Sequence, residues 1–518
     1  MAGVRHFDQY LENDMAINFM PTRYRPIVLA LMVWSTFVGL ASGAAPVQTA
    51  SPERPRVVLL TDYWKDPDEI QAMIRFLSYA NEYEIEGLIA TSLAFGDGSV
   101  RPEWIVDILG DYGRVYDTLK LHARPGYPFP TPESLKSVVR PGARMIRTWA
   151  GRNAAGVEKG FPVPYPPGAL DTRTCEPVER WLKPGMESAG AELIIQVVDR
   201  KDPRPVWILV WGGAVDLAQA INKVRRDRSP EDAARFIGKI RLHQSNWQDT
   251  GTVWIWNHVP ELFFDFTNVV KGGLSFEAPE SLRDESWVRK HLLEGHGPLA
   301  ARYPKAGVNN KTGYLIKEGD SPTFLHLLAP GLTDIEQPEW GGWGGRRARL
   351  YPDRNFFVDG RDRNPASTDP KREMQWSLGR WAHAISNDFA ARLDWQVKPP
   401  SETNHPPVAR LNNDATTRVL RKTVSPSELV TLDATGSSDP DGNKLSYKWW
   451  QYDEPGTLAE HIRLVGANSI RATFVAPQVS ETRTLHVILE VTDDGTPQLT
   501  GYRRVVFTIA PSQSKSAK

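Results

Sequence analysis

The chain has 518 residues but only one cysteine, Cys175, so no disulfide can form within it. Charge of one sign is also lacking, because Lys plus Arg and Asp plus Glu number 62 each. This balance gives no overall field that would favour nucleic acid or an anionic membrane, and we expect neither as a partner. The sequence has no phosphate-binding loop, nucleophile elbow, zinc-binding helix motif or paired CxxC. Its chemistry must therefore come from other residue types.

Long apolar runs are scarce as well, and only one stands out. Positive residues at 23–26 precede an apolar stretch from Ile27 to Ala41, and small residues follow at 42–46. This order is typical of a secretory signal cleaved near Ala44, and the stretch is short for a membrane span. We interpret 1–44 as a signal peptide with an over-long N-terminus; an uncleaved anchor is the alternative. The mature protein is thus expected to be exported, periplasmic or extracellular, without a membrane span.

Strand and helix patterns alternate over residues 54–398. The buried-strand pattern of Val57–Leu60 is followed by Ile70, Met73, Ile74 and Leu77, which share one helical face. Further strands are expected at 85–92, 206–211 and 239–243, with helical stripes after the first two. Repeated strand–helix units predict an α/β domain with a doubly wound, mostly parallel sheet.

After Lys398 the period changes to two. Leu485, Val487, Leu489 and Val491 alternate with other residues, and Gly, Pro and Asp mark turns at 439–443 and 493–497. Short strands with such turns predict a C-terminal all-β immunoglobulin-like sandwich over 404–511. The polar residues 512–518 are expected to be a disordered tail.

The densest chemical signal is the segment TDYWKDPDE at 61–69. Its four carboxylates, Asp62, Asp66, Asp68 and Glu69, follow a predicted buried strand and precede a helix. Open α/β sheets form ligand sites at the carboxyl ends of their strands. Carboxylates this close repel one another unless a proton or a cation compensates them, and Ca²⁺ prefers oxygen ligands. The bland alternative is that Asp68 and Glu69 only cap the helix.

Several separated segments carry a family resemblance. They are 61–69, 75–92, the WGGAVDLAQAI run at 211–221, EGDSPTFLHLL at 318–328, PEWGGWGGR at 338–346 and the β-domain segment 432–452. In this order they resemble the nucleoside hydrolases, calcium-dependent N-ribohydrolases with a parallel-sheet α/β fold. More closely, the chain is similar to an exported branch of that family that is often labelled cellulose-binding.

The resemblance implies a calcium-dependent hydrolase that acts on a riboside or related sugar. It implies that the cation holds the sugar diol and activates a water, and that Asp62 takes the proton from that water. The implied metal ligands are Asp62, Asp66, Asp68, Glu69, the Val215 carbonyl and Asp320.

The chain also departs from the family pattern. Tyr63, Trp64 and Lys65 stand where relatives usually have glycines, and Glu69 stands in place of an aspartate. The loop at 243–249 carries fewer acids than is typical. An alternative hypothesis is therefore a non-catalytic protein that binds cellulose or another polysaccharide with a degenerate cleft and the β-sandwich.

Predicted sugar-binding residues are Asn246 in that loop and Trp340, Trp343 and Arg346 in the WGGWGGR run. Indole rings can stack on sugars, and glycines let a backbone approach a ligand. A structural turn with packed indoles is the alternative. The expected partner is a sugar-containing small molecule or a polysaccharide, and the sequence does not predict an oligomeric state.

Overall fold

A computed structural model describes residues 54–63, 67–92, 98–145, 177–246, 249–268, 285–303, 316, 318–328, 331–414 and 416–511. The predicted signal peptide, the residues 64–66, Cys175 and the C-terminal tail lie outside the described residues. Residues 51–518 form one compact unit. Within the described ranges, no helix has the length and apolar character that crossing a membrane requires.

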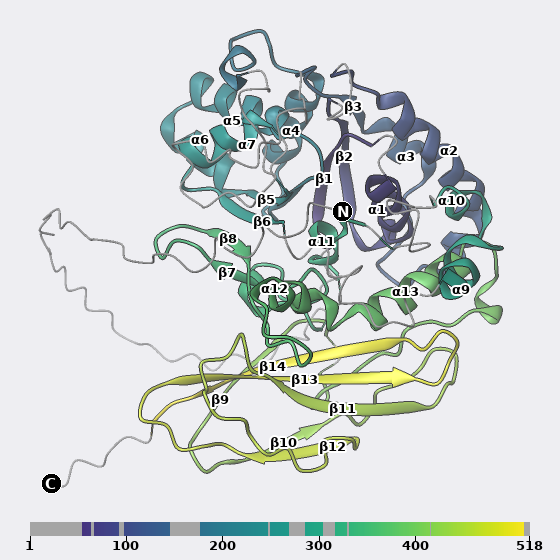
Figure 1. Ribbon diagram of the computed structural model, residues 1–518, viewed down its shortest axis with the longest axis vertical. Helices are drawn as coiled ribbons and strands as arrows, with labels where there is room; N and C mark the ends of the chain where they lie inside the picture. The colour runs from purple at the N-terminus through teal and green to yellow at the C-terminus, as the bar shows by residue number, and fades with distance from the viewer. Residues whose placement is uncertain are drawn as a thin grey trace, which may run out of the picture. The chain divides into compact units, whose positions relative to one another are not determined.

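The first part of this unit contains an eight-stranded sheet with the order β3-β2-β1-β4-β5-β6-β8-β7 (Figure 1). All neighbouring strands are parallel except β7 and β8. The strands are β1 Arg56–Thr61, β2 Glu84–Ala90, β3 Val139–Pro141, β4 Val206–Val210, β5 Ile240–Ser245, β6 Phe263–Thr267, β7 Arg347–Arg349 and β8 Phe356–Asp359. The main helices are α1 Pro67–Ser78, α2 Pro102–Leu119, α3 Pro132–Ser137, α4 Ala189–Asp199, α5 Val215–Asp227, α6 Pro230–Gly238, α7 Thr250–His258, α9 Glu285–Val288, α10 Gly297–Ala300, α11 Ser321–Leu325, α12 Pro370–Gly379 and α13 Ala382–Asp394.

Both faces of this sheet are covered. Successive side chains of a strand point to opposite faces, and those of β1 enter two different cores. Val57 and Leu59 belong to a core with residues of α1, α2 and α13, whereas Val58 and Leu60 belong to a core with residues of α4 and α5. The apolar residues that predicted the first helix, Met73, Ile74 and Leu77, are fully buried in the first core. These features confirm the predicted doubly wound fold.

The strand order places a topological switch point between β1 and β4. The chain first extends the sheet from β1 through β2 to β3 and then returns to the other side of β1 with β4. Ligands of open α/β folds bind outside the carboxyl ends of the strands at such a point. On this chain, that place is bordered by Asp62, directly after β1, and by Trp211–Gly213, directly after β4.

The C-terminal part has a four-stranded sheet, β11-β13-β14-β9, and a two-stranded sheet, β10-β12. Its strands are β9 Leu420–Val424, β10 Leu429–Asp433, β11 Leu445–Tyr452, β12 Arg471–Val475, β13 Arg483–Asp493 and β14 Thr500–Ile509. The alternating residues Leu485, Val487, Leu489 and Val491 all face a core between the sheets. The predicted β-sandwich is thus confirmed.

The opposite face of the larger sheet packs on the α/β part. Ile488, Tyr452 and Tyr502 are buried in the same core as α1 and α13. The Tyr452 hydroxyl donates to Asp362 at 2.6 Å, and Arg504 donates from Nη1 to the Trp340 carbonyl at 2.8 Å. The two parts therefore share apolar core and buried polar contacts.

Candidate carboxylate site

Three segments bring acidic side chains to the switch point. Asp62 follows β1, Asp68 and Glu69 lie in the first turn of α1, and Asp320 directly precedes α11. Asp62 and Asp320 are each only 5% exposed. Four of the predicted site residues thus converge, whereas Asp66 lies outside the described residues.

The electrostatics of this group show how close the acids are. The pKa of Glu69 lies well above its usual value. Burial of its carboxyl group is the largest cause, followed by the charge of Asp62 and a hydrogen bond with Asp62, and then by the charges of Asp320 and Asp68. A hydrogen bond between two carboxyl groups needs a proton, so Glu69 keeps its proton where an isolated glutamate would lose it. Oxygen ligands of this kind fit a hard cation such as Ca²⁺ in their chemistry.

The described carboxylates fit a cation in their donor chemistry, but among themselves they do not form a preformed metal site. In the part of the chain that the structure describes, no three His, Cys, Asp or Glu side chains are arranged to hold a metal ion. Cation binding would therefore require Glu69 to give up its proton and the carboxylates to adjust around the ion.

The loop after β4 closes the site from the side of the sheet and leaves no room for side chains. A Cβ on Gly212 would lie 2.2 Å from the Thr91 hydroxyl and 2.9 Å from the Asp62 amide nitrogen and Oδ1. A Cβ on Gly213 would lie 2.1 Å from Asp249 Oδ2. Gly212 therefore lets the β4 loop lie directly against Asp62, and Gly213 lets it lie against Asp249.

Val215 begins α5 directly after this loop. Its N–H donates to Asp249 Oδ2 at 3.2 Å. Carbonyl groups in the first turn of a helix point along the helix axis toward the N–H four residues on, as the Ala214 carbonyl does toward the Ala218 N–H. A carbonyl oxygen has a second lone pair, so the role of the Val215 carbonyl as a metal ligand stays a prediction.

Asp320 is positioned by its neighbour Glu318. Glu318 is fully buried, has a positive φ of 27°, and accepts hydrogen bonds from Arg75 of α1, from the Tyr303 hydroxyl at 2.7 Å and from Ser321 at 2.9 Å. Its own N–H donates to Gln71 of α1 at 3.1 Å. These contacts fasten the segment that carries Asp320 to the helix that carries Glu69.

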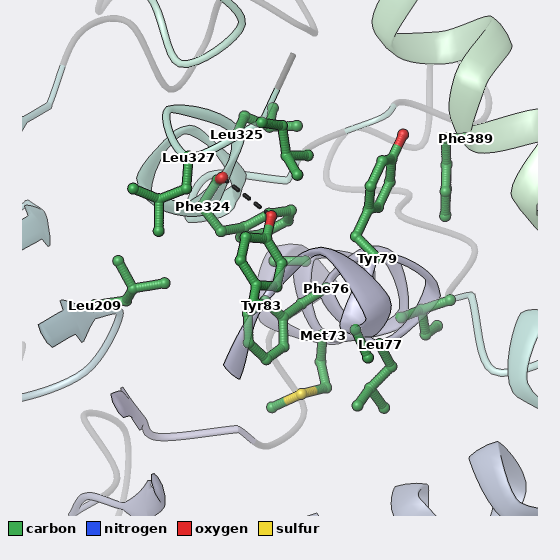
Figure 2. Packing of buried hydrophobic residues seen from close by; sticks show 14 of the residues in the cluster. Met73, Phe76, Leu77, Tyr79, Tyr83, Leu209, Phe324, Leu325, Leu327 and Phe389 are labelled. Atoms are coloured by element: carbon green, nitrogen blue, oxygen red, sulfur yellow. Dashed lines mark hydrogen bonds between the residues drawn. The ribbon is translucent and has the colours of Figure 1, made fainter. Parts of the chain in front are cut away.

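Apolar packing reinforces this attachment. Figure 2 shows Phe324 of α11 next to Phe76 of α1 and Tyr83, whose hydroxyl donates to the Phe324 carbonyl at 3.1 Å. The rings of Phe76 and Phe324 lie 5.5 Å apart in an edge-on arrangement. The α1–α11 contact is therefore part of the rigid core, and the carboxylates lie at its edge.

The comparisons with known proteins agree with this geometry. A family model described as the nucleoside hydrolase-like domain of cellulose-binding Sde182 matches residues 56–347. A second, described as the C-terminal domain of the cellulose-binding protein Sde0182, matches residues 429–509. The chain belongs to the Sde182 family.

One solved structure is similar over most of the chain. It is a nucleoside hydrolase-related hypothetical protein from Saccharophagus degradans, associated with carbohydrate metabolism, with 31% identity, a TM-score of 0.71, and coverage of 88% of this chain and 100% of that one. The effector protein XOO4466 is 11% identical, covering 64% of this chain and 95% of its own, with a TM-score of 0.33. The PKD domain of KIAA 1837 is 25% identical, covering 21% and 93%, with a TM-score of 0.16. No curated protein matches.

In this Sde182-family chain the WGGWGGR run lies at the contact with the C-terminal sheet. Trp343 is only 4% exposed and meets the ring of Tyr502 edge-on at 6.1 Å. Arg346 donates to Asp362 at 2.6 Å. Trp340 is half-buried, edge-on to His486 at 5.0 Å, with the guanidinium of Arg421 over its ring. The structure therefore favours the alternative of a packed indole for Trp343.

Asn246 is placed differently. It directly follows β5 and has a positive φ of 61°, and its N–H donates to the Thr267 carbonyl at 2.8 Å. Because β5 is parallel to β4, Asn246 lies at the same edge of the sheet as the β4 loop. This position keeps Asn246 as a predicted sugar-binding residue.

Two residues that support the site were not predicted. Asp249 caps α7 by accepting from the Thr252 N–H at 3.1 Å, and it also holds the first residue of α5. Its capping role could have been read from Asp-Thr-Gly-Thr before an apolar run. Glu318 carries no such signal, because its partner Arg75 lies 243 residues away in sequence.

Proposed function

We propose that this chain is a glycosidic hydrolase of the nucleoside hydrolase-like type that acts on a riboside or related sugar at the carboxylate site. The observation that carries the proposal is the convergence of Asp62, Asp68, Glu69 and Asp320 at the switch point, where burial and the other carboxylates raise the pKa of Glu69. Buried acids gathered at a switch point are typical of a functional site. Membership of a family whose main domain is nucleoside hydrolase-like supports the proposal.

In this proposal the carboxylates of Asp62, Asp68, Glu69 and Asp320 hold a Ca²⁺ ion. When bound, the ion would fix two sugar hydroxyls and lower the pKa of a water molecule. Asp62 is buried, directly follows the central strand and faces the β4 loop. It is therefore placed to accept a proton from a water that attacks the anomeric carbon. Glu69 has to lose its own proton first, so we expect calcium affinity to rise with pH.

The second candidate is a carbohydrate-binding protein that does not cleave its ligand. It is favoured by the description of both matching family models as cellulose-binding. It also agrees with the raised pKa of Glu69, since a protonated Glu69 that is hydrogen-bonded to Asp62 needs no cation. The two candidates differ in what Ca²⁺ and Asp62 contribute.

The deciding experiment is a thermal melt of the full chain, stripped of metal and titrated with Ca²⁺, for the wild type and for Asp62→Asn. The matched control is Asp117→Asn, since Asp117 is 87% exposed on α2. A cation that binds only the folded protein raises the melting temperature as its concentration passes the dissociation constant. We expect a saturable rise in the wild type and the control that is lost in Asp62→Asn.

Turnover is then measured on a panel of ribosides and related glycosides, alongside retention on cellulose. Calcium-dependent release of the sugar that Asp62→Asn abolishes would support hydrolysis. No thermal shift at millimolar Ca²⁺ and no turnover, with cellulose retention unchanged in Asp62→Asn, would overturn it in favour of the second candidate.

A further inference from the structure

Two histidines meet where the α/β part joins the C-terminal part. His122 ends a short 3-10 helix, Lys120–His122, after α2, and His405 lies in the interdomain linker, defined here as residues 399–408. Nδ1 of His122 is 2.9 Å from Nε2 of His405. Both rings stack on Trp395, with ring centroids 5.1 and 5.0 Å away. The pair is thus held in a fixed relative orientation.

Each histidine also has an outer partner that accepts hydrogen bonds. Nε2 of His122 is 2.9 Å from the Lys398 carbonyl oxygen. Nδ1 of His405 is 3.0 and 3.1 Å from the two carboxylate oxygens of Asp441, and the His405 backbone N–H donates to the same carboxylate at 2.7 Å. Asp441 belongs to the turn between β10 and β11. A continuous row of contacts therefore runs from the α/β part into the β-sandwich.

The row fixes the number of protons on the two rings. A carbonyl oxygen and a carboxylate only accept, so His122 Nε2 and His405 Nδ1 must each carry a hydrogen. The contact between the rings needs one more. Three hydrogens on two imidazoles are one more than two neutral rings supply and one fewer than two imidazolium rings would carry. The geometry is satisfied only when the pair holds a single positive charge.

The surroundings place that charge on His405. The pKa of His122 is lowered to about 4, chiefly by burial, and the nearby charges of His405 and Arg392 act in the same direction, against the Lys398 carbonyl and Asp441. Lys398 Nζ is itself paired with Asp394 at 2.7 Å. His405, in contrast, touches the Asp441 carboxylate directly. His122 is then the neutral acceptor at Nδ1 and His405 the charged donor.

We propose that His122, His405 and Asp441 form a pH-sensitive clasp, closed by one extra proton, that fixes the interdomain linker against both domains. A second proton would put two N–H groups against each other across 2.9 Å. Loss of the extra proton would leave three contacts with only two hydrogens. The clasp therefore holds within a window of pH and loosens the linker on either side. This role is independent of the carboxylate site.

The direct test is a nitrogen NMR spectrum of the full chain with ¹⁵N-labelled histidine at pH 6.5. His405→Gln and His122→Gln assign the two rings. We expect His405 to carry hydrogen on both nitrogens and His122 on Nε2 only. Two or four ring hydrogens in total, or the charge on His122, would overturn the proposal, and this readout needs only the wild type to be folded.

The second test follows proteolysis of the linker with pH. The rate at each pH is normalised to cleavage of an unfolded peptide with the linker sequence. We expect the wild-type linker to be cut about tenfold faster at pH 4.5 than at pH 6.5, as loss of one charge-assisted hydrogen bond implies. Both Gln variants should be cut fast at pH 6.5 and change less than about twofold between the two values.

The matched control is His461→Gln. His461 is an exposed histidine of the C-terminal part, and its Nδ1 lies 3.3 Å from the Asp453 carboxylate. This variant should keep the wild-type profile. A wild-type profile in His122→Gln and His405→Gln as well would overturn the proposal.

Discussion

Two glutamates, one in the first turn of α1 and one in contact with α1, have opposite surroundings. Glu318 is fully buried and receives two N–H groups from Arg75 of α1 and two hydroxyl donors, from Tyr303 and Ser321. Glu69, in the first turn of α1, faces Asp62, Asp320 and Asp68. The donors around the first acid stabilise its charge, whereas the described acids around the second oppose it.

The difference shows which site is structural and which is a candidate for chemistry. Although burial alone lowers the pKa of Arg75, Glu318 raises it above its usual value, so the guanidinium stays charged inside the core. At Glu69 the same burial and three more acids raise the pKa of a carboxyl group. Folded proteins accept such local repulsion mainly where function requires it. The Glu318 network provides the rigid support, and the acids around Glu69 form the candidate site for chemistry.

The largest effect on stability is expected at Glu318. Glu318→Gln leaves the Arg75 guanidinium buried without its countercharge. We expect the free energy of unfolding to fall by about 3–5 kcal/mol, measured by urea denaturation. As a control, Arg235→Gln removes an exposed pair with Asp232 and should change stability by less than about 1 kcal/mol. Equal losses in both variants would mean that Glu318 is not the structural anchor.

A substitution at Glu69 is expected to change stability in the opposite direction. Glu69→Gln keeps the shape of a protonated glutamate and removes a charge that its neighbours oppose. We expect the metal-free protein at pH 8 to be stabilised by about 0.5–2 kcal/mol, which is the usual gain from a single stabilising substitution. The control Glu103→Gln, at an exposed position in the first turn of α2, should not stabilise. Destabilisation by Glu69→Gln would indicate that the cluster is compensated.

The fold was far easier to predict from the sequence than the contacts of these two glutamates. The strands and helices could be predicted because the spacing of apolar residues, as in Val57–Leu60 and Leu485–Val491, shows which side chains are buried. The carboxylates of 61–69 could be predicted as a site because they are adjacent in sequence. Arg75 and Glu318 could not be paired, since their contact depends on how α11 packs on α1. The same holds for Trp343, whose ring meets that of Tyr502 of β14 edge-on.

The contribution of Glu69 to stability is also expected to depend on pH. The folded-state pKa of Glu69 is raised above its unfolded value, so the folded protein binds the proton more tightly. Stability from Glu69 is then fully present below the unfolded pKa and is lost as pH rises through the folded pKa. We expect the advantage of Glu69→Gln to be absent at pH 4 and to grow toward pH 8. Melting curves of both proteins across this range check it, and a pH-independent difference would contradict it.

The smallest effect on stability is expected at Asp68, which lies at the rim of the acidic cluster. Asp68 is half-buried, and its charge is the last and weakest of those that raise the pKa of Glu69. It also lies at the N-terminus of α1, where a negative charge is favoured by about 0.3–1 kcal/mol. In Asp68→Asn the relieved repulsion and the lost helix-terminus interaction oppose each other. We therefore expect urea denaturation to show a change within about 0.5 kcal/mol. A gain as large as that of Glu69→Gln would instead place Asp68 among the acids that Glu69 opposes most strongly.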